Sequence, residues 1–151
     1  ERRNKIMAGF NIEFPTELMS SINKLTDESD TMFKEMTQAG AKVVYNNVKS
    51  NMKLSFKRTE SIEKGLKITR PYRTITDDGI NTKVGFYGYK DDGTPIPLIA
   101  LAREYGTSKG EKKKSFLRKA FNQKSAITNA MLEVQKRYIK DEWLWITKNY
   151  I

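Results

Sequence analysis

Paired carboxylates beside glycine are the first residues in this chain whose types and spacing could do chemistry. Asp77-Asp78-Gly79 and Asp91-Asp92-Gly93 each place two acids directly before a glycine. General acid–base chemistry needs two carboxylates that face one substrate in different environments. Adjacent aspartates in an Asp-Gly sequence are better explained by turn propensity. We therefore interpret both pairs as turns.

A lysine-rich loop is the second candidate, within the stretch 101–121, LAREYGTSKGEKKKSFLRKAF. Gly106 and Gly110 suggest an anion cradle, but GxxxxGK[ST] after a buried strand is absent. The lysines could instead neutralise the phosphates of a nucleic acid, and charge alone does not choose between that partner and an acidic protein surface. The residues expected to contact DNA or another partner are Lys109, Lys112, Lys113, Lys114 and Lys119.

The composition narrows the remaining chemistry. The 151 residues contain no cysteine and no histidine, which excludes disulfides, thiolate nucleophiles, histidine bases and the usual zinc and copper sites. Oxygen-only magnesium or calcium sites stay open by composition, although no calcium-loop pattern is present. We predict no catalytic residue, no cofactor and no metal, and hence a protein that is not an enzyme. The net charge is +10, and ten basic residues against two glutamates lie between Lys109 and Lys140.

The chain length fits one domain, which we expect over residues 1–151, with a flexible N-terminal arm at 1–13 and an aromatic tail at 141–151. Trp143 and Trp145 in that tail either anchor a subunit interface or cap the chain's own core. No stretch approaches the ~20 consecutive apolar residues that span a bilayer, so we expect no membrane partner.

The candidate residues above must be positioned by helices and strands, and the first of these is a helix predicted for the N-terminal third of the chain. Apolar residues recur there at three- and four-residue steps or their sums, namely Leu18, Ile22, Leu25, Met32, Met36 and Val43. The polar residues 26–30 interrupt this stripe. We expect either one long kinked helix or two helices, at about 15–26 and 29–52.

Alternating apolar and polar residues predict a hairpin in the middle of the chain, over 66–74 and 82–90. Pro71 makes the first strand an edge strand or introduces a bulge. A short helix over 97–105 follows, ended by Gly106 in a left-handed conformation. From Phe116 onward an apolar face predicts a long C-terminal helix. The expected class is α+β, with a small antiparallel sheet packed against a long N-terminal and a long C-terminal helix.

One motif resembles a known family. Glu104-Tyr105-Gly106-Thr107, followed by Phe116-Leu117-Arg118-x-Ala120, is similar to the E-[YF]-G-T and P-F-L-R-P-A segments of small tailed-phage and prophage head–tail joining proteins, also described as tail-completion, minor tail or tail-terminator-like proteins. The expected element order is also similar. Ser115 and Lys119 stand where that family usually has proline.

The resemblance implies a structural virion protein of the phage neck. Such a subunit would form a homo-oligomeric ring, often a hexamer, that caps the tail tube and contacts the tube protein and the head-completion or connector proteins. It would be made in the bacterial host cytoplasm and end in the virion, with non-specific contact to DNA in the channel.

For the loop, the resemblance implies anchors at both ends. Tyr105 and Phe116 would fix the loop to the sheet, and Glu104 would pair with Arg103, with Arg118 or with a neighbouring subunit. Trp143, Trp145 and the hairpin would form the subunit interface. The alternative function is a basic nucleic-acid-binding protein that contacts DNA through Lys112–Lys119.

Overall fold

The computed structural model describes the backbone of residues 16–76 and 78–150, and within these ranges the side chains of residues 23, 26–76, 78–139 and 148. The elements are α1 (Thr16–Ser55), α2 (Glu60–Glu63), β1 (Leu66–Ile68), β2 (Tyr72–Arg73), β3 (Ile80–Asn81), β4 (Val84–Phe86), α3 (Ile96–Tyr105), α4 (Leu117–Phe121) and α5 (Lys124–Tyr150). The expected α+β class, with a small antiparallel sheet and long helices, is confirmed. The expected arm at 1–13 lies outside the described residues.

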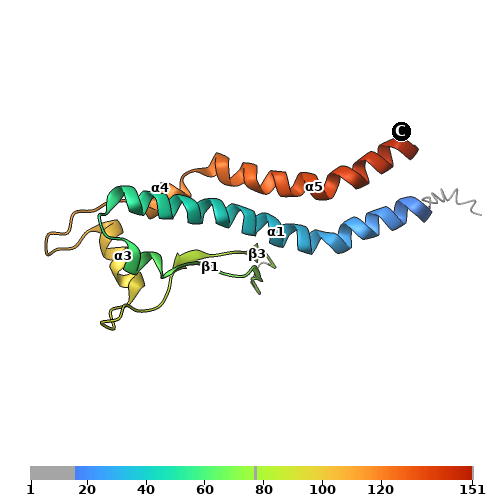
Figure 1. The fold of residues 1–151 in the computed structure, drawn as a ribbon. Coiled ribbons are helices and arrows are strands. Elements are labelled where there is room, and N and C mark those ends of the chain that lie inside the picture. Colours follow the sequence, from blue (N-terminus) through green and yellow to red (C-terminus); the bar gives the residue numbers. More distant parts are fainter. Residues whose placement is uncertain (1–15, 77, 151) are drawn as a thin grey trace, which may run out of the picture.

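The N-terminal third is a single helix of 40 residues, α1, which Figure 1 shows as bent. The two-helix alternative is therefore wrong. The polar residues 26–30 stay helical because they are satisfied locally: the Ser29 hydroxyl donates to the carbonyl of Thr26 at 2.7 Å, and Asp30 pairs with Lys34 one turn later.

The middle segment is one antiparallel hairpin in two short pieces. Strand β1 pairs with β4 (Ile68 opposite Val84), and β2 pairs with β3 (Arg73 opposite Ile80). Pro71 lies at the interruption, where it has no N–H to donate to a ladder. The prediction of a proline-disturbed strand is thus confirmed.

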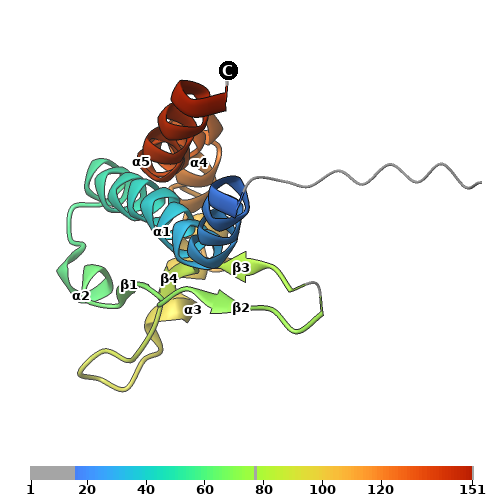
Figure 2. The ribbon, with the colours of Figure 1, turned by 90° about the vertical axis from the view of Figure 1, so that its right-hand side faces the viewer.

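Helix α1 is the middle layer of the molecule. Figures 1 and 2 show α5 running antiparallel along one side of α1, with the hairpin and α3 on the other side. A glycine permits close approach of the two long helices: a Cβ on Gly40 would lie 3.2 Å from Ile127 Cγ2 and 3.3 Å from Met131 Cγ.

The core lies where the C-terminal half of α1 meets the hairpin, α3 and α4. Val44, Val48 and Met52 recur every four residues along α1 and form its buried stripe. The other buried members are Ile62, Leu66, Ile96, Ala100, Phe116 and Ala120. Five elements, α1, α2, β1, α3 and α4, therefore contribute to this one cluster, together with Phe116 directly before α4.

The C-terminal helix is interrupted, contrary to the prediction of one helix from Phe116 onward. Helix α4 ends at Phe121, α5 begins at Lys124, and the amide of Asn47 donates to Gln123 at the break at 2.9 Å. The break lets α4 cover the core with Ala120 while α5 runs along α1.

The second Asp-Gly segment forms the predicted turn before α3. The carbonyl of Thr94 accepts from the Lys90 N–H at 2.9 Å, and Gly93 has a φ of 79°. Hydrogen bonds from Thr94 and Lys90 lower the pKa of Asp92 below its ordinary value. In the first segment Asp78 also has a positive φ of 55°, and Asp77 lies outside the described residues.

Candidate functional site

Glu104, at the end of α3, is the best-organised polar side chain of the described structure. It is buried, with 2% of its surface exposed, although its charge would favour water. Its Oε2 accepts from the N–H groups of Phe116 and Leu117, both at 2.8 Å. Its Oε1 accepts from the Ser115 hydroxyl at 2.9 Å and from the Arg118 N–H at 3.2 Å. We call these five residues the Glu104 junction.

The three backbone donors belong to the start of α4, where N–H groups have no acceptor within the helix. A buried carboxylate thus satisfies them and joins α3 to α4 across the loop. Burial acts to raise the pKa of Glu104, but the hydrogen bonds from Leu117, Ser115, Arg118 and Phe116 outweigh it, and the pKa is lowered. Of the alternative partners predicted for Glu104, Arg118 contacts it, through its backbone N–H rather than its guanidinium.

Gly106 turns the chain out of α3. Its φ is 79°, as predicted, with an extended ψ of 175°, and its N–H donates to the Ala102 carbonyl at 2.7 Å. A Cβ there would lie 2.8 Å from the Glu111 carbonyl oxygen and 3.0 Å from the Lys113 nitrogen. Only glycine lets the backbone of loop residues 111–113 pass this close to position 106.

The loop folds back on its own base. The Thr107 N–H donates to the Glu111 carbonyl at 3.0 Å, and the Lys114 N–H donates to the Arg103 carbonyl at 3.0 Å. The side chains of Lys109, Lys112, Lys113 and Lys119 are exposed. The lysines thus extend from a fixed backbone.

The two aromatic anchors predicted for the loop differ in the structure. Phe116 is fully buried and makes edge contacts with Phe56 and Phe86, at centroid distances of 5.5 and 6.1 Å. Tyr105, by contrast, is 59% exposed, and its role as an anchor stays a prediction. Leu117 packs against the core, and Ala120 is fully buried within it.

Phe56, Arg103 and Asn51 complete the site. Phe56 and Asn51 were missed from the sequence, and Arg103 was predicted only as one of the alternative partners of Glu104. The Arg103 guanidinium lies 4.7 Å from the centroid of the Phe56 ring, and the Asn51 amide donates to the Phe116 carbonyl at 3.1 Å. A signal for Phe56 was available, because it continues the four-residue step of Val48 and Met52. Nothing in the sequence marks Asn51, or the contact of Arg103 with the Phe56 ring.

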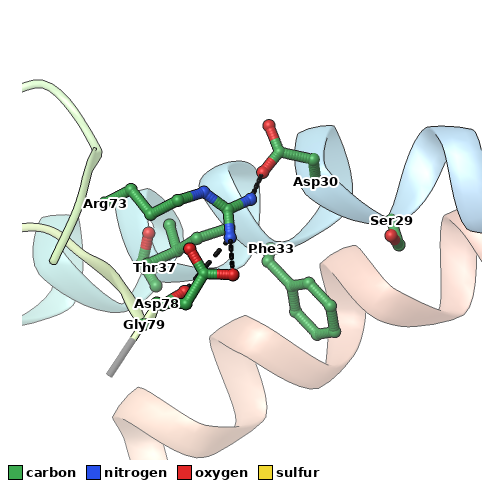
Figure 3. A pocket seen from close by; sticks show the side chains of 8 residues that line it. Ser29, Asp30, Phe33, Thr37, Arg73, Asp78 and Gly79 are labelled. Atoms are coloured by element: carbon green, nitrogen blue, oxygen red, sulfur yellow. Dashed lines mark hydrogen bonds and ion pairs between the residues drawn. The ribbon is translucent and has the colours of Figure 1, made fainter. Parts of the chain in front are cut away.

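A second polar cluster lies at the far end of the hairpin (Figure 3). The Arg73 guanidinium on β2 lies between Asp30 on α1, with which it forms an ion pair, and Asp78, whose carboxylate is 3.0 Å away. A cavity of about 370 Å³ beside them is also lined by Phe33 and Thr37. Hydrogen bonding to Lys34 lowers the pKa of Asp30; burial opposes this, and Arg73 adds to it. The cluster holds the hairpin to α1.

Neither cluster offers a metal site: among the described side chains, those of residues 23, 26–76, 78–139 and 148, no group of three or more acidic residues could hold an ion. No helix in the same ranges is long and apolar enough to cross a membrane.

Comparison of the sequence with models of known protein families shows which family the chain belongs to. Residues 16–106 match the family described as "Bacteriophage HK97-gp10, putative tail-component". The chain belongs to this HK97 gp10-like family. It is therefore a structural component of a bacteriophage tail, as the resemblance in the sequence had indicated, and is associated with the virion. No curated protein and no solved structure matched the chain.

The family match covers α1, the hairpin and α3, and it ends at Gly106. Glu104 and Tyr105 lie inside the matched range, and Phe116, with which Glu104 bonds, lies beyond it. In this HK97 gp10-like chain the junction therefore connects the matched part to α4 and α5. The tail residues Trp143 and Trp145, predicted at a subunit interface, have side chains outside the described residues.

Proposed function

We propose that the chain is a ring-forming subunit of the phage neck, which completes the tail tube and joins it to the head. Family membership supports a role in the tail. The ring is supported by surfaces that have no partner within the described part of the chain: two open sheet edges and one apolar face of α3.

The open sheet edges carry the proposal. Hydrogen bonds from Tyr87 to Gly65 (2.8 Å) and from Thr69 to Lys83 (2.9 Å) bracket the β1–β4 ladder. In an antiparallel ladder the intervening pairs, Leu66 with Phe86 and Ile68 with Val84, turn their N–H and C=O groups outward. Within the described part of the chain these outward groups have no hydrogen-bond partner.

The two edges differ, because one belongs to β1 and the other to β4. Pairing the β1 edge of one copy with the β4 edge of the next is a heterologous contact between identical chains. Repetition of such a contact closes a ring if the rotation that relates one copy to the next is a whole-number fraction of 360°. A two-stranded sheet also gains stability from each added strand.

Helix α3 offers an apolar face directly after β4. Leu98, Leu101 and Tyr105 follow at steps of three and four, so they form one stripe, the α3 stripe, opposite the buried Ile96 and Ala100. Leu98 and Leu101 are 60% and 50% exposed. We assign this stripe to the next copy in the ring, as the apolar contact beside the paired edges.

The remaining partners follow from this role. A ring has two faces, which would meet the tail tube protein and the head-completion or connector proteins, and six copies is the stoichiometry that the resemblance implies. The alternative of a DNA-binding protein that acts through Lys112–Lys119 is compatible with ring membership, since the genome passes through the neck.

Sedimentation velocity tests the ring. We expect the wild type to sediment as a closed oligomer and Leu98→Glu/Leu101→Glu to sediment as a monomer with an unchanged thermal melt. The matched control is Leu54→Glu/Leu132→Glu, which changes two exposed leucines on α1 and α5, 86% and 41% exposed, and should still assemble. A wild type that stays monomeric at every concentration, even beside the tail tube protein, would overturn the proposal.

A further inference from the structure

Cations from three separate parts of the chain meet at one end of the molecule. Lys57 and Arg58 follow α1, Arg103 ends α3, and six more cations lie from Lys109 to Lys119. Figure 1 shows the end of α1, the loop after α3 and α4 together at the end opposite the C-terminus. We call these nine cations the basic end. Only Glu104 and Glu111 lie within the same segments, 55–58 and 103–119.

Two side chains of the basic end, Arg103 and Lys114, are held in place by acceptors other than carboxylates. The Arg103 guanidinium donates to the Arg58 carbonyl at 3.2 Å, and the Lys114 ammonium donates to the Ser55 carbonyl at 2.8 Å. The ring of Phe56 lies under both cations, 4.7 Å from Arg103 and 5.4 Å from Lys114. Carbonyl oxygens and a π face orient these charges and leave them un-neutralised.

No residue of the basic end forms an ion pair within the described structure. Ion pairs do form elsewhere, on Lys34, Lys49, Lys53, Arg73, Lys90, Lys136 and Arg137. The one carboxylate buried at the basic end, that of Glu104, is occupied by the N–H groups of α4. All nine cations of the basic end thus lack a carboxylate partner in the described structure.

We propose that the basic end binds the phosphate backbone of duplex DNA without reading its sequence. Protein–protein interfaces are depleted in lysine, whereas protein–DNA interfaces are strongly positive, so lysines without carboxylate partners favour DNA over an acidic protein. Lysines act on phosphates as point charges and release counterions. The choice of duplex DNA rests on the proposed place in the neck, where the packaged genome passes.

Fluorescence anisotropy with a labelled duplex of about 30 base pairs, at several salt concentrations, tests this proposal. The variant Lys109→Ala/Lys112→Ala/Lys113→Ala removes three exposed ammonium groups that form no hydrogen bond or ion pair in the described structure. Its matched control, Lys42→Ala/Lys67→Ala/Lys83→Ala, removes the same charge from α1 and the hairpin.

We expect the loop variant to lose at least ~10-fold in affinity for the duplex. The slope of the logarithm of the binding constant against the logarithm of the salt concentration should become shallower by about three, since each phosphate contact contributes about 0.9 to it. The control should lose about twofold or less. Equal affinity and slope in the loop variant and the wild type would overturn the proposal. So would poly-glutamate binding as tightly as the duplex, because the partner would then be an acidic protein surface.

Sedimentation of the same proteins separates this proposal from the ring. A ring without lysine-dependent DNA binding would overturn the DNA contact and leave the assembly role standing. Lysine-dependent DNA binding by a protein that never forms a ring would support the DNA contact and contradict the assembly role.

Discussion

Glu104 shows at the scale of one residue how a short motif can have a structural purpose. The side chain lies 2.8 Å from two N–H groups that are twelve and thirteen residues away, and so fixes where α4 starts. The loop between them can carry many charges because its two ends are held by this carboxylate and by Gly106. Glu104 is therefore a positioning residue for the lysine-bearing loop.

Replacing Glu104 by glutamine should destabilise the protein at neutral pH. The amide keeps the shape but loses the charge, and hydrogen bonds to charged groups contribute about 1.5–3 kcal/mol each. Because folding lowers the pKa of Glu104, its charge stabilises the fold fully above the unfolded pKa of about 4.3 and progressively less as pH falls through the folded pKa. We expect the free energy of unfolding, measured with urea, to be about 1–3 kcal/mol lower in Glu104→Gln than in the wild type at pH 7, and the difference to be much smaller at pH 3.

Glu111→Gln is the matched control for that measurement, since Glu111 is exposed in the same loop and should behave as wild type at both pH values. If Glu104→Gln and Glu111→Gln were equally stable, or if the loss at Glu104 did not change with pH, the carboxylate would not be the group that holds α4.

At the scale of elements, α1 organises the molecule because every other layer packs against it. Its contact with α5 depends on Gly40, whose missing side chain leaves Ile127 and Met131 in close approach. The same contact is supported at the surface by Glu35 and Arg137, whose charged atoms are 3.8 Å apart.

Gly40→Leu should separate α5 from α1. Leucine favours a helix over glycine by about 0.8–1 kcal/mol, but overpacking of the contact costs about 1–3 kcal/mol. We therefore expect the free energy of unfolding to fall by about 1 kcal/mol. Amide hydrogen exchange in α5 should also become faster. Gln38→Leu, at an exposed position of the same helix, should be neutral or stabilising. Unchanged exchange in α5 for Gly40→Leu would show that the two helices do not need this close approach.

The sequence predicted the elements better than their contacts. Periodicity revealed α1, Pro71 marked the broken hairpin, and Gly106 marked the end of α3. The break at Asn122 and Gln123 was missed, because the apolar period runs on from Ala120 to Ile127 across it. The backbone partners of Glu104 were also missed, since backbone N–H groups leave no trace in the residue types around them.

The whole molecule is polarised. The core and the Glu104 junction lie toward the basic end, whereas the Arg73 cluster and the long overlap of α1 with α5 extend toward the C-terminal end (Figure 1). In a ring built through the hairpin and α3, one end of each copy would face the channel or a neighbouring ring. We expect the basic end to face the channel, because its cations would there meet the phosphates of the DNA that the proposal places in the neck.

Electron cryomicroscopy of the neck in intact virions tests the ring most directly. We predict a closed ring of copies of this chain between the connector and the tail tube, with β1 of each copy paired to β4 of the next and the loop from Lys109 to Lys114 turned toward the DNA. Copies distributed along the tail tube, or a neck ring in which the hairpin edges are unpaired, would contradict it.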